Sequence, residues 1–311
     1  MPLLPDLAEL IALRGAAQGL SLHAQRPALA RLQGGHRSAQ RGRGLEFEEV
    51  RPYAAGDDAR NIDWRVTARR GKPHTKLFRE ERERPVWLLA DLHPGLFFGS
   101  RRQLESALLL RAAALLGWAA VQGGDRLGAV LAGTDGVPRL WPPRAREAGV
   151  LPVLQALVQA QPRAPGLPGR EGLDSALAAL RPVVRPGSVL LVLSDFSALG
   201  ERGEAALAAL SLHAECRLLW VADALERSGL PAGAFRVGLP GRQWWLDGER
   251  SLGAWRSAWA AREQRLETLA RRLRLPLIRL DTGDEVARTL PALLRERAVP
   301  ARPAGAATPA P

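Results

Sequence analysis

Val86-Trp-Leu-Leu-Ala-Asp91 and Ser188-Val-Leu-Leu-Val-Leu-Ser-Asp195 are two short apolar runs that each end in an acid. Runs of this kind are typical of strands that are buried on both faces of a parallel sheet. Helical patterns cover 101–122, 144–161, 173–183, 201–212 and 252–274, and further strands are expected at 126–132, 216–223 and 276–281. This alternation predicts an α/β fold with a doubly wound, mostly parallel sheet from Pro85 onward.

Two hairpins are expected within this region. The first joins Arg126–Ala132 to Val137–Trp141 through the turn Gly133-Thr-Asp-Gly136, and it predicts one antiparallel edge strand. The second, Phe235–Val237 with Gln243–Leu246, lies in an irregular insertion at about 225–248.

A dense run of mixed charge precedes the α/β region. Between Arg41 and Arg84, 21 of 44 residues are charged, 12 basic and 9 acidic, and apolar residues punctuate them. Interleaved charge with regular apolar positions indicates a folded segment, not a solvated tail. We expect strands at 44–50 and 75–80, and a short helix that follows the turn Gly56-Asp57-Asp58 and buries Ile62 and Val66. Either aspartate could cap that helix.

The predicted organisation has three parts. Residues 1–84 form an N-terminal module, 85–298 form the α/β domain, and the Ala/Pro-rich tail 299–311 is disordered.

Composition narrows the classes of function. The net charge is +12 and the pI is about 11.3, as in many nucleic-acid binders, but 42 of the 44 basic residues are arginine and are spread along the chain. We attribute the charge to compositional bias and rank arginine-driven nucleic-acid binding third. Cys216 is the only cysteine and is expected in the core. The sequence shows no signal peptide and no apolar run of about 20 residues, so we expect a cytoplasmic protein with no membrane partner.

The carboxyl ends of the parallel strands are the expected location of a site. Asp91, Asp195 and Asp223 each end a strand, and Asp91 and Asp195 converge if their strands are neighbours. With the hydroxyls of Ser194 and Ser197 they could hold Mg²⁺, although strand-terminal aspartates more often only bond loop amides.

Other candidates for chemistry are weak. His93 stands alone and is interpreted as a loop histidine, and no phosphate-binding loop, nucleophile elbow or zinc motif is present. The tryptophans are expected mostly in the core. Trp244-Trp245 and the pair Trp255/Trp259 could form a docking surface, but packing against the sheet is favoured. We therefore expect no catalytic activity.

Several ordered motifs resemble a known family. They are Gly42-Arg-Gly-Leu-Glu-Phe47, Arg51-Pro-Tyr53, Gly56-Asp-Asp58, Arg60, Ile62-Asp-Trp64 and Thr67-Ala-Arg69, followed by Glu80-Glu81, Ser194-Asp-Phe196 and Asp223-Ala-Leu-Glu226. They resemble the signature of the domain of unknown function 58 family, over about 29–223. The resemblance implies a von Willebrand factor A-like core with one antiparallel edge strand. It also implies an adaptor role beside a MoxR-type AAA+ ATPase, in assembling or activating a client protein.

The metal motif of von Willebrand A domains is incomplete in this chain. Those domains bind Mg²⁺ through D-x-S-x-S, a threonine and a later aspartate, whereas this chain reads Asp91-Leu-His-Pro-Gly95 and has Glu171 nearest the threonine position. Of that set only Asp91 and Asp195 remain, so no cofactor is expected.

Our leading hypothesis is a non-enzymatic adaptor, and the alternative is a divalent-metal-dependent hydrolase that uses Asp91 and Asp195. The signature residues are the candidates for partner binding, and we expect Arg60 and Asp63 to serve binding more than folding. The candidates are Arg51, Tyr53, Gly56, Asp57, Asp58, Arg60, Asp63, Trp64 and Arg69.

Overall fold

The computed structural model describes residues 3–22, 45–54, 59–80, 83–133, 135–169, 171–239 and 241–296. The chain divides into two compact units, and each is described separately below. Residues 1–25 and 84–311 form the α/β unit, and residues 26–83 form the signature unit. The turn at Gly56, Asp57 and Asp58 and the predicted tail at 299–311 lie outside the described residues.

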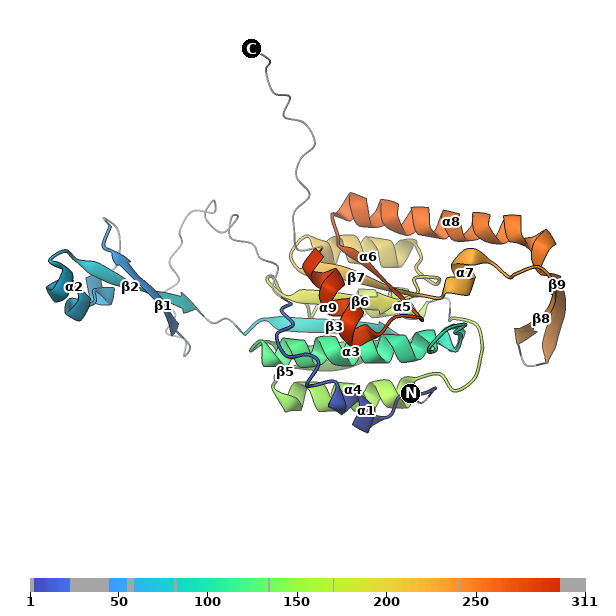
Figure 1. Cartoon of the computed structure of the whole chain (residues 1–311), viewed down its shortest axis with the longest axis horizontal. Helices are drawn as coiled ribbons and strands as arrows, with labels where there is room; N and C mark the ends of the chain where they lie inside the picture. The colour runs from blue at the N-terminus through green and yellow to red at the C-terminus, as the bar shows by residue number, and fades with distance from the viewer. Residues whose placement is uncertain are drawn as a thin grey trace, which may run out of the picture. The chain divides into compact units, whose positions relative to one another are not determined.

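The α/β unit is built on a six-stranded sheet in the order β10-β7-β6-β3-β4-β5 (Figure 1). Its strands are β3 (Pro85–Asp91), β4 (Arg126–Ala132), β5 (Arg139–Ala145), β6 (Val189–Ser194), β7 (Glu215–Ala222) and β10 (Leu277–Asp281). All neighbours are parallel except β4 and β5, which are antiparallel. The predicted mostly parallel sheet with one antiparallel edge strand is therefore confirmed.

The edge position of β5 explains its sequence. The strand was expected to end at Trp141, but it continues through Pro142 and Pro143 to Ala145. Proline cannot donate to a sheet ladder and is tolerated on an edge strand, where one side is unpaired.

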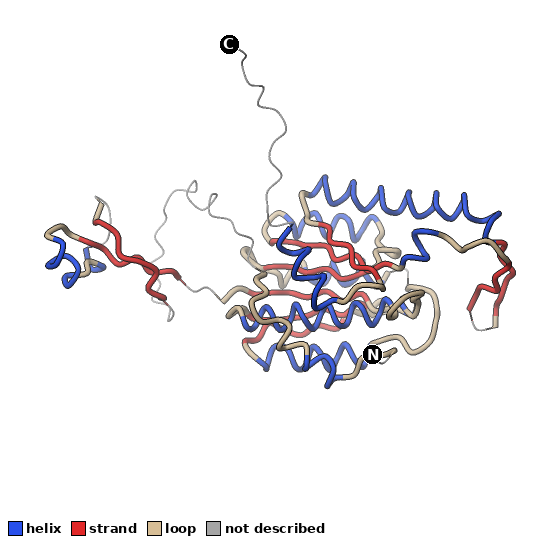
Figure 2. The backbone as a smooth tube through the Cα atoms, viewed as in Figure 1, coloured by secondary structure: helices blue, strands red, loops and turns tan. Residues whose placement is uncertain are grey.

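Helices cover both faces of the sheet, as the helical tubes in Figure 2 show. One face carries α1 (Leu7–Ala12), α3 (Glu105–Gln122), α4 (Glu147–Ala160) and α9 (Val286–Glu296), and the other carries α5 (Gly172–Leu180), α6 (Glu201–Ser211) and α8 (Gly248–Leu273). Leu88 and Ala90 of β3 join the first hydrophobic cluster, while Trp87 and Leu89 join the second. Burial on both faces is the reason that central strands such as β3 and β6 are apolar almost throughout. Cys216 is buried among them, as predicted.

The N-terminal residues pack onto the α/β unit, which corrects the predicted placement of residues 1–25 in the N-terminal module. Leu10 of α1 is fully buried, and its carbonyl accepts from Trp118 Nε1 at 3.0 Å. Glu9 pairs with the buried Arg111 of α3 at 2.6 Å. Leu22 O accepts from Arg217 Nη2 at 2.8 Å, so the segment is held at both ends. This packing could not be predicted from the sequence, because α1 is short and the buried residues that hold it lie far along the chain.

The signature unit contains an antiparallel pair, β1 (Leu45–Pro52) and β2 (His74–Glu80), with the 3-10 turn η1 (Ala59–Asn61) and the helix α2 (Trp64–Arg70) between them. Both strands were predicted. The helix begins later than expected, because Asp63 is its N-cap, and Ile62 bridges Thr75 before the helix starts. Gly71, at φ 67°, ends it in the left-handed conformation that glycine favours.

No helix in the described part of the chain combines the length and apolarity that a bilayer span requires.

Candidate functional site

Asp91 and Asp195 meet at the point where the strand order reverses. From β3 the chain proceeds to β4 on one side and later returns to β6 on the other, so the ends of β3 and β6 open a switch point of the sheet. Asp91 ends β3 and Asp195 follows β6 directly. The predicted convergence is confirmed: Ser194 Oγ donates to Asp91 Oδ2 at 2.6 Å.

Asp91 is a nearly buried carboxyl with a raised pKa. Burial disfavours its ionised form, and the charge of Asp195 adds to this effect, although His93 opposes it. The result is a pKa of about 6. Ionised Asp91 is therefore held in the folded protein against an electrostatic cost.

Asp195 behaves in the opposite way. Burial would raise its pKa, but the hydrogen bond and charge of His93, together with Arg262, hold it at about 2. His93 Nε2 lies 3.3 Å from Asp195 Oδ1, and the backbone N–H and hydroxyl of Ser197 donate to the same oxygen, each at 3.0 Å. Burial disfavours the charge of His93, yet the hydrogen bond to Asp195 raises its pKa overall. Two adjacent acids thus differ in pKa because their partners differ.

A strained backbone supports this arrangement. Phe196, between Asp195 and Ser197, has φ 57°, in the left-handed region that bulky side chains rarely adopt. Its N–H donates to Ser194 Oγ at 2.7 Å, so the serine that bonds Asp91 also fixes the turn. Such strain costs of order 1–3 kcal/mol and tends to occur at functional positions.

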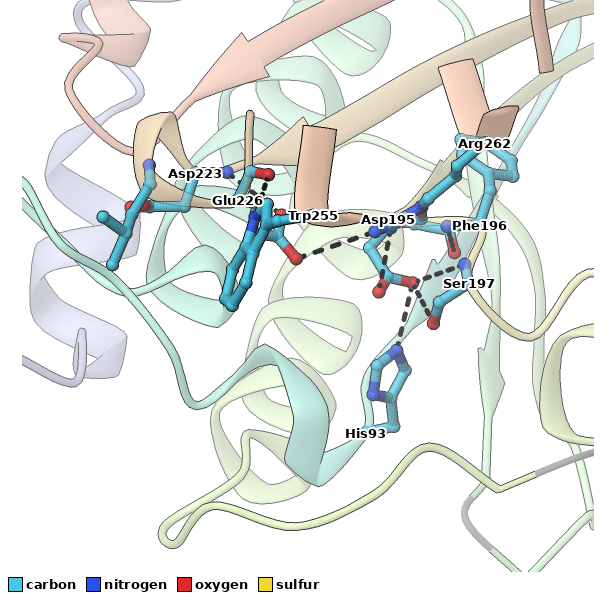
Figure 3. Close-up of polar contacts among 10 residues, drawn as sticks. His93, Asp195, Phe196, Ser197, Asp223, Glu226, Trp255 and Arg262 are labelled. Atoms are coloured by element: carbon cyan, nitrogen blue, oxygen red, sulfur yellow. Dashed lines mark hydrogen bonds and ion pairs between the residues drawn. The ribbon is translucent and has the colours of Figure 1, made fainter. Parts of the chain in front are cut away.

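Arg262 of α8 supplies a cation to the site (Figure 3). Its guanidinium lies 3.2 Å from Asp195 Oδ2, donates to the backbone carbonyl of Asp195, and lies 3.6 Å from Glu226 Oε1. Its Cζ is 5.8 Å and 5.7 Å from the ring centres of Trp220 and Trp259, which stack on each other at 5.0 Å. Trp259 is a core residue, as favoured from the sequence. The long helix α8 is thereby tied to the end of β6.

A second acidic pair lies next to Arg262. Burial and the neighbouring Glu226 raise the pKa of Glu105 well above its ordinary value. Glu226 closes a capping box on α7 (Ala224–Ser228), and its backbone carbonyl accepts from Trp255 Nε1 at 2.7 Å. Arg262 therefore lies between Asp195 and this second pair of carboxyl groups.

Asp223 has a structural role apart from the other acids. It accepts from Ser100 N and Leu225 N, both at 2.7 Å, and from the hydroxyls of Ser100 and Thr282. These bonds lower its pKa despite its burial. It fixes the loops after β3, β7 and β10, and it is not part of the predicted acidic site.

The ligand atoms of Asp91, His93 and Asp195 lie within 4.8 Å of one another, which is compatible with a metal. They do not fit Mg²⁺, which prefers oxygen ligands in octahedral geometry. His93 Nε2 is bonded to Asp195, and the Arg262 guanidinium is already beside the same carboxylate. The geometry is that of a carboxylate already bonded to a histidine and an arginine of the chain itself.

The sequence-predicted partner residues lie in the other unit. Asp63 accepts from Arg65 N at 3.0 Å and Val66 N at 3.1 Å, so it caps α2, and the expectation that it serves binding more than folding stays a prediction. Tyr53 N donates to Pro73 O at 2.9 Å. Trp64, one of the predicted partner-binding residues, is 71 % exposed, and Arg60 and Arg69 are also exposed. Arg51, also predicted, lies in β1 and donates to Pro52 O at 3.1 Å.

Sequence reasoning missed two functional residues of the α/β unit. His93, interpreted as a loop histidine, contacts Asp195, and its position two residues after Asp91 was the available signal. Arg262 carried no signal, because it is one of several arginines on α8.

Residues 49–268, more than half of the chain, match the model of a family described as protein of unknown function DUF58. The chain belongs to this family. This DUF58 protein is 35 % identical, over 166 residues, to uncharacterised proteins of Mycobacterium tuberculosis and Mycobacterium bovis. The match covers 53 % of this chain and 51 % of each relative, so it spans about half the length of those proteins.

Two solved structures are similar at low identity. One is the conserved hypothetical protein BatB of Bacteroides thetaiotaomicron, at TM-score 0.43 and 12 % identity, covering 69 % of this chain and 98 % of that one. The other is an aerotolerance-related membrane protein of Bacteroides fragilis, at TM-score 0.41 and 13 % identity, covering 68 % and 99 %.

Proposed function

We propose that this DUF58 protein is a non-enzymatic adaptor with a von Willebrand factor A-like core, which works with a MoxR-type AAA+ ATPase on a client protein. The observation that carries the proposal is the exposure of Trp64 within the family signature. A large aromatic side chain that folding leaves in water is available to a partner.

The surroundings of Trp64 suit a protein interface. Trp64 is the first residue of α2, and Ala68 lies one turn later on the same exposed side. Arg65 and Arg69 have the same spacing and are exposed as well. Tryptophan and arginine are the residues most enriched among those that dominate binding energy at interfaces. The surface formed by Trp64, Arg65, Ala68 and Arg69, here called the α2 face, is our candidate for ATPase binding.

The α/β unit also favours binding over catalysis. In an enzyme of this architecture, the acids at the switch point would act on a substrate or a metal. Here Asp195 is bonded to His93, Ser197 and Arg262, and Asp91 to Ser194. These contacts use the acids to fix α8 and the loop after β6 in place.

The test is recovery of the ATPase by tagged full-length protein from native extract, with and without ATP. We expect the wild type to recover an AAA+ ATPase of the MoxR type in a nucleotide-dependent manner, and Trp64→Ala to lose at least about tenfold, as expected for a residue that dominates an interface. The thermal midpoint should not change, because the side chain is mostly exposed.

Trp245→Ala is the matched control, since Trp245 is equally exposed but lies in the other unit. It should recover the ATPase as the wild type does. Equal recovery by Trp64→Ala would exclude the α2 face, and failure of the wild type to recover any ATPase would remove the partner from the proposal.

The metal-dependent hydrolase is the second candidate, because three ligand atoms do converge at Asp91, His93 and Asp195. A Mg²⁺ site with a dissociation constant near 0.1 mM would add about 2.7 kcal/mol of stability at about 10 mM Mg²⁺. We expect no rise of the melting temperature in Mg²⁺, beyond the effect of matched ionic strength. A rise that Asp91→Ala abolishes would favour the hydrolase instead.

A further inference from the structure

The insertion at 225–248 continues from α7 into an antiparallel hairpin. β8 (Ala234–Leu239) pairs with β9 (Arg242–Asp247), and among the described strands neither pairs with any other. Gly241, at φ 80°, provides the turn, and Gly238 brings the strands so close that a Cβ there would meet Arg242 O at 2.2 Å. In Figure 1 the hairpin stands clear of the six-stranded sheet of its unit.

The hairpin exposes aromatic side chains on both of its faces. Cross-strand partners share a face, so Phe235–Leu246, Val237–Trp244 and Leu239–Arg242 lie on one side, and Arg236–Trp245 and Gly238–Gln243 on the other. Trp244 is 48 % and Trp245 is 75 % exposed. Both tryptophans are on β9, and they lie on opposite faces of the hairpin beside the outer edge of this strand. This corrects the expectation that they pack against the sheet.

Two strands are fewer than a sheet needs for independent stability, and the edge of β9 that faces away from β8 presents unpaired backbone groups. We propose that this edge of β9 binds an extended segment of the client by strand addition. The inference rests on the proposed adaptor role only in naming a client as the source of the segment.

The side chains of β9 define the segment's chemistry. A residue opposite Arg242 would be acidic, because the Arg242 guanidinium is exposed over the Trp244 ring at 5.1 Å with no carboxylate paired to it in the described residues. Residues opposite Trp244 and Trp245 would be consecutive and β-branched or aromatic, one packing on each face. A strand read by its backbone and by alternate side chains is an established mode of peptide recognition.

The inference can be tested with the full-length protein and two fluorescein-labelled peptides, Glu-Thr-Val-Val-Thr-Thr and its reverse, Thr-Thr-Val-Val-Thr-Glu. For either strand direction, one of the two places its acid opposite Arg242 and a threonine opposite Asp247. We expect saturable binding by fluorescence polarisation, and slower amide hydrogen exchange in 242–247 when the peptide is bound. The better-binding peptide with lysine in place of its glutamate should bind at least about fivefold more weakly, because Arg242 repels the lysine. A version with N-methylated valines keeps every side chain but loses backbone donors, and should not bind.

The matched variants are Trp244→Ala/Trp245→Ala, expected to lose peptide binding with an unchanged melting temperature, and Trp64→Ala, expected to keep it. Equal binding of the N-methylated peptide, or no binding of the parent peptide, would overturn strand addition. Tryptophan-dependent binding to phosphatidylglycerol vesicles or to single-stranded DNA in place of the peptide would also overturn it. Because the ATPase test depends on Trp64 in the other unit, either proposal can fail while the other stands.

Discussion

Replacing Arg262 with methionine should lower the free energy of unfolding of the α/β unit by about 3 kcal/mol. The loss leaves the buried Asp195 carboxylate without its arginine partner, with His93 still bonded to it, and Glu226 without its ion pair. Methionine keeps an unbranched side chain against Trp220 and Trp259, so most of the apolar packing is retained. Urea unfolding followed by far-UV circular dichroism measures the effect.

Arg256→Met is the control, since Arg256 lies on the same helix but is exposed. Among the described residues it is bonded only to the carbonyl of Ser228. This substitution should change the free energy of unfolding by no more than about 0.5 kcal/mol. A double-mutant cycle with Asp195→Asn tests the cause. If the carboxylate is what Arg262 compensates, the two losses should fall short of additivity by at least about 1 kcal/mol. Additive losses would mean that Arg262 acts through packing alone.

The sheet could be predicted from the sequence because its strands are buried on both faces. That burial demands uninterrupted apolar runs such as Val86–Ala90 and Val189–Leu193, and these are visible without a structure. The position of Asp91 and Asp195 followed from the rule that parallel strands end at one edge. Local pattern was enough for both.

What could not be predicted depends on contacts between distant residues. Arg262 is 67 positions from Asp195, and nothing in the periodicity of α8 distinguishes it from its neighbours. The attachment of residues 1–25 rests on Arg111 and Arg217, whose burial only tertiary structure reveals. The exposure of Trp64 could not be derived from the sequence either, because it depends on which distant residues cover the side chain.

The two acids at the switch point differ in what they contribute to folding. Asp195 is stabilised by its partners when ionised, so it favours the folded state above its unfolded pKa. Asp91 is stabilised when protonated, because burial raises its pKa. At neutral pH the ionised Asp91 therefore works against folding.

Asp91→Asn should accordingly stabilise the protein, and the gain should grow with pH. A rise in pKa from 3.8 to about 6 corresponds to about 3 kcal/mol, since each pKa unit is worth about 1.36 kcal/mol. In the wild type, protonated Asp91 contributes its full stability to the folded state below pH 3.8, and this contribution is lost as pH rises through 6. Asparagine does not titrate, so the variant loses nothing over this range. The asparagine carbonyl can still accept from Ser194. The difference in unfolding free energy between variant and wild type, measured by urea titration from pH 4 to pH 8, should rise toward this value.

Asp195→Asn is the control of opposite sign. The pKa of Asp195 in the folded wild type is about 2, below its unfolded value, so the wild type gains stability as pH rises from 2 to 4. The asparagine variant should therefore become less stable than the wild type over this range, with no gain at higher pH. A difference for Asp91→Asn that stays flat between pH 4 and pH 7 would mean that burial does not raise its pKa. A further outcome is that Asp91→Asn gains stability and yet fails to recover the ATPase or to bind the peptide designed for β9. In that case the charge of Asp91 is kept for binding at the expense of stability. If both partners still bind, the charge serves neither surface.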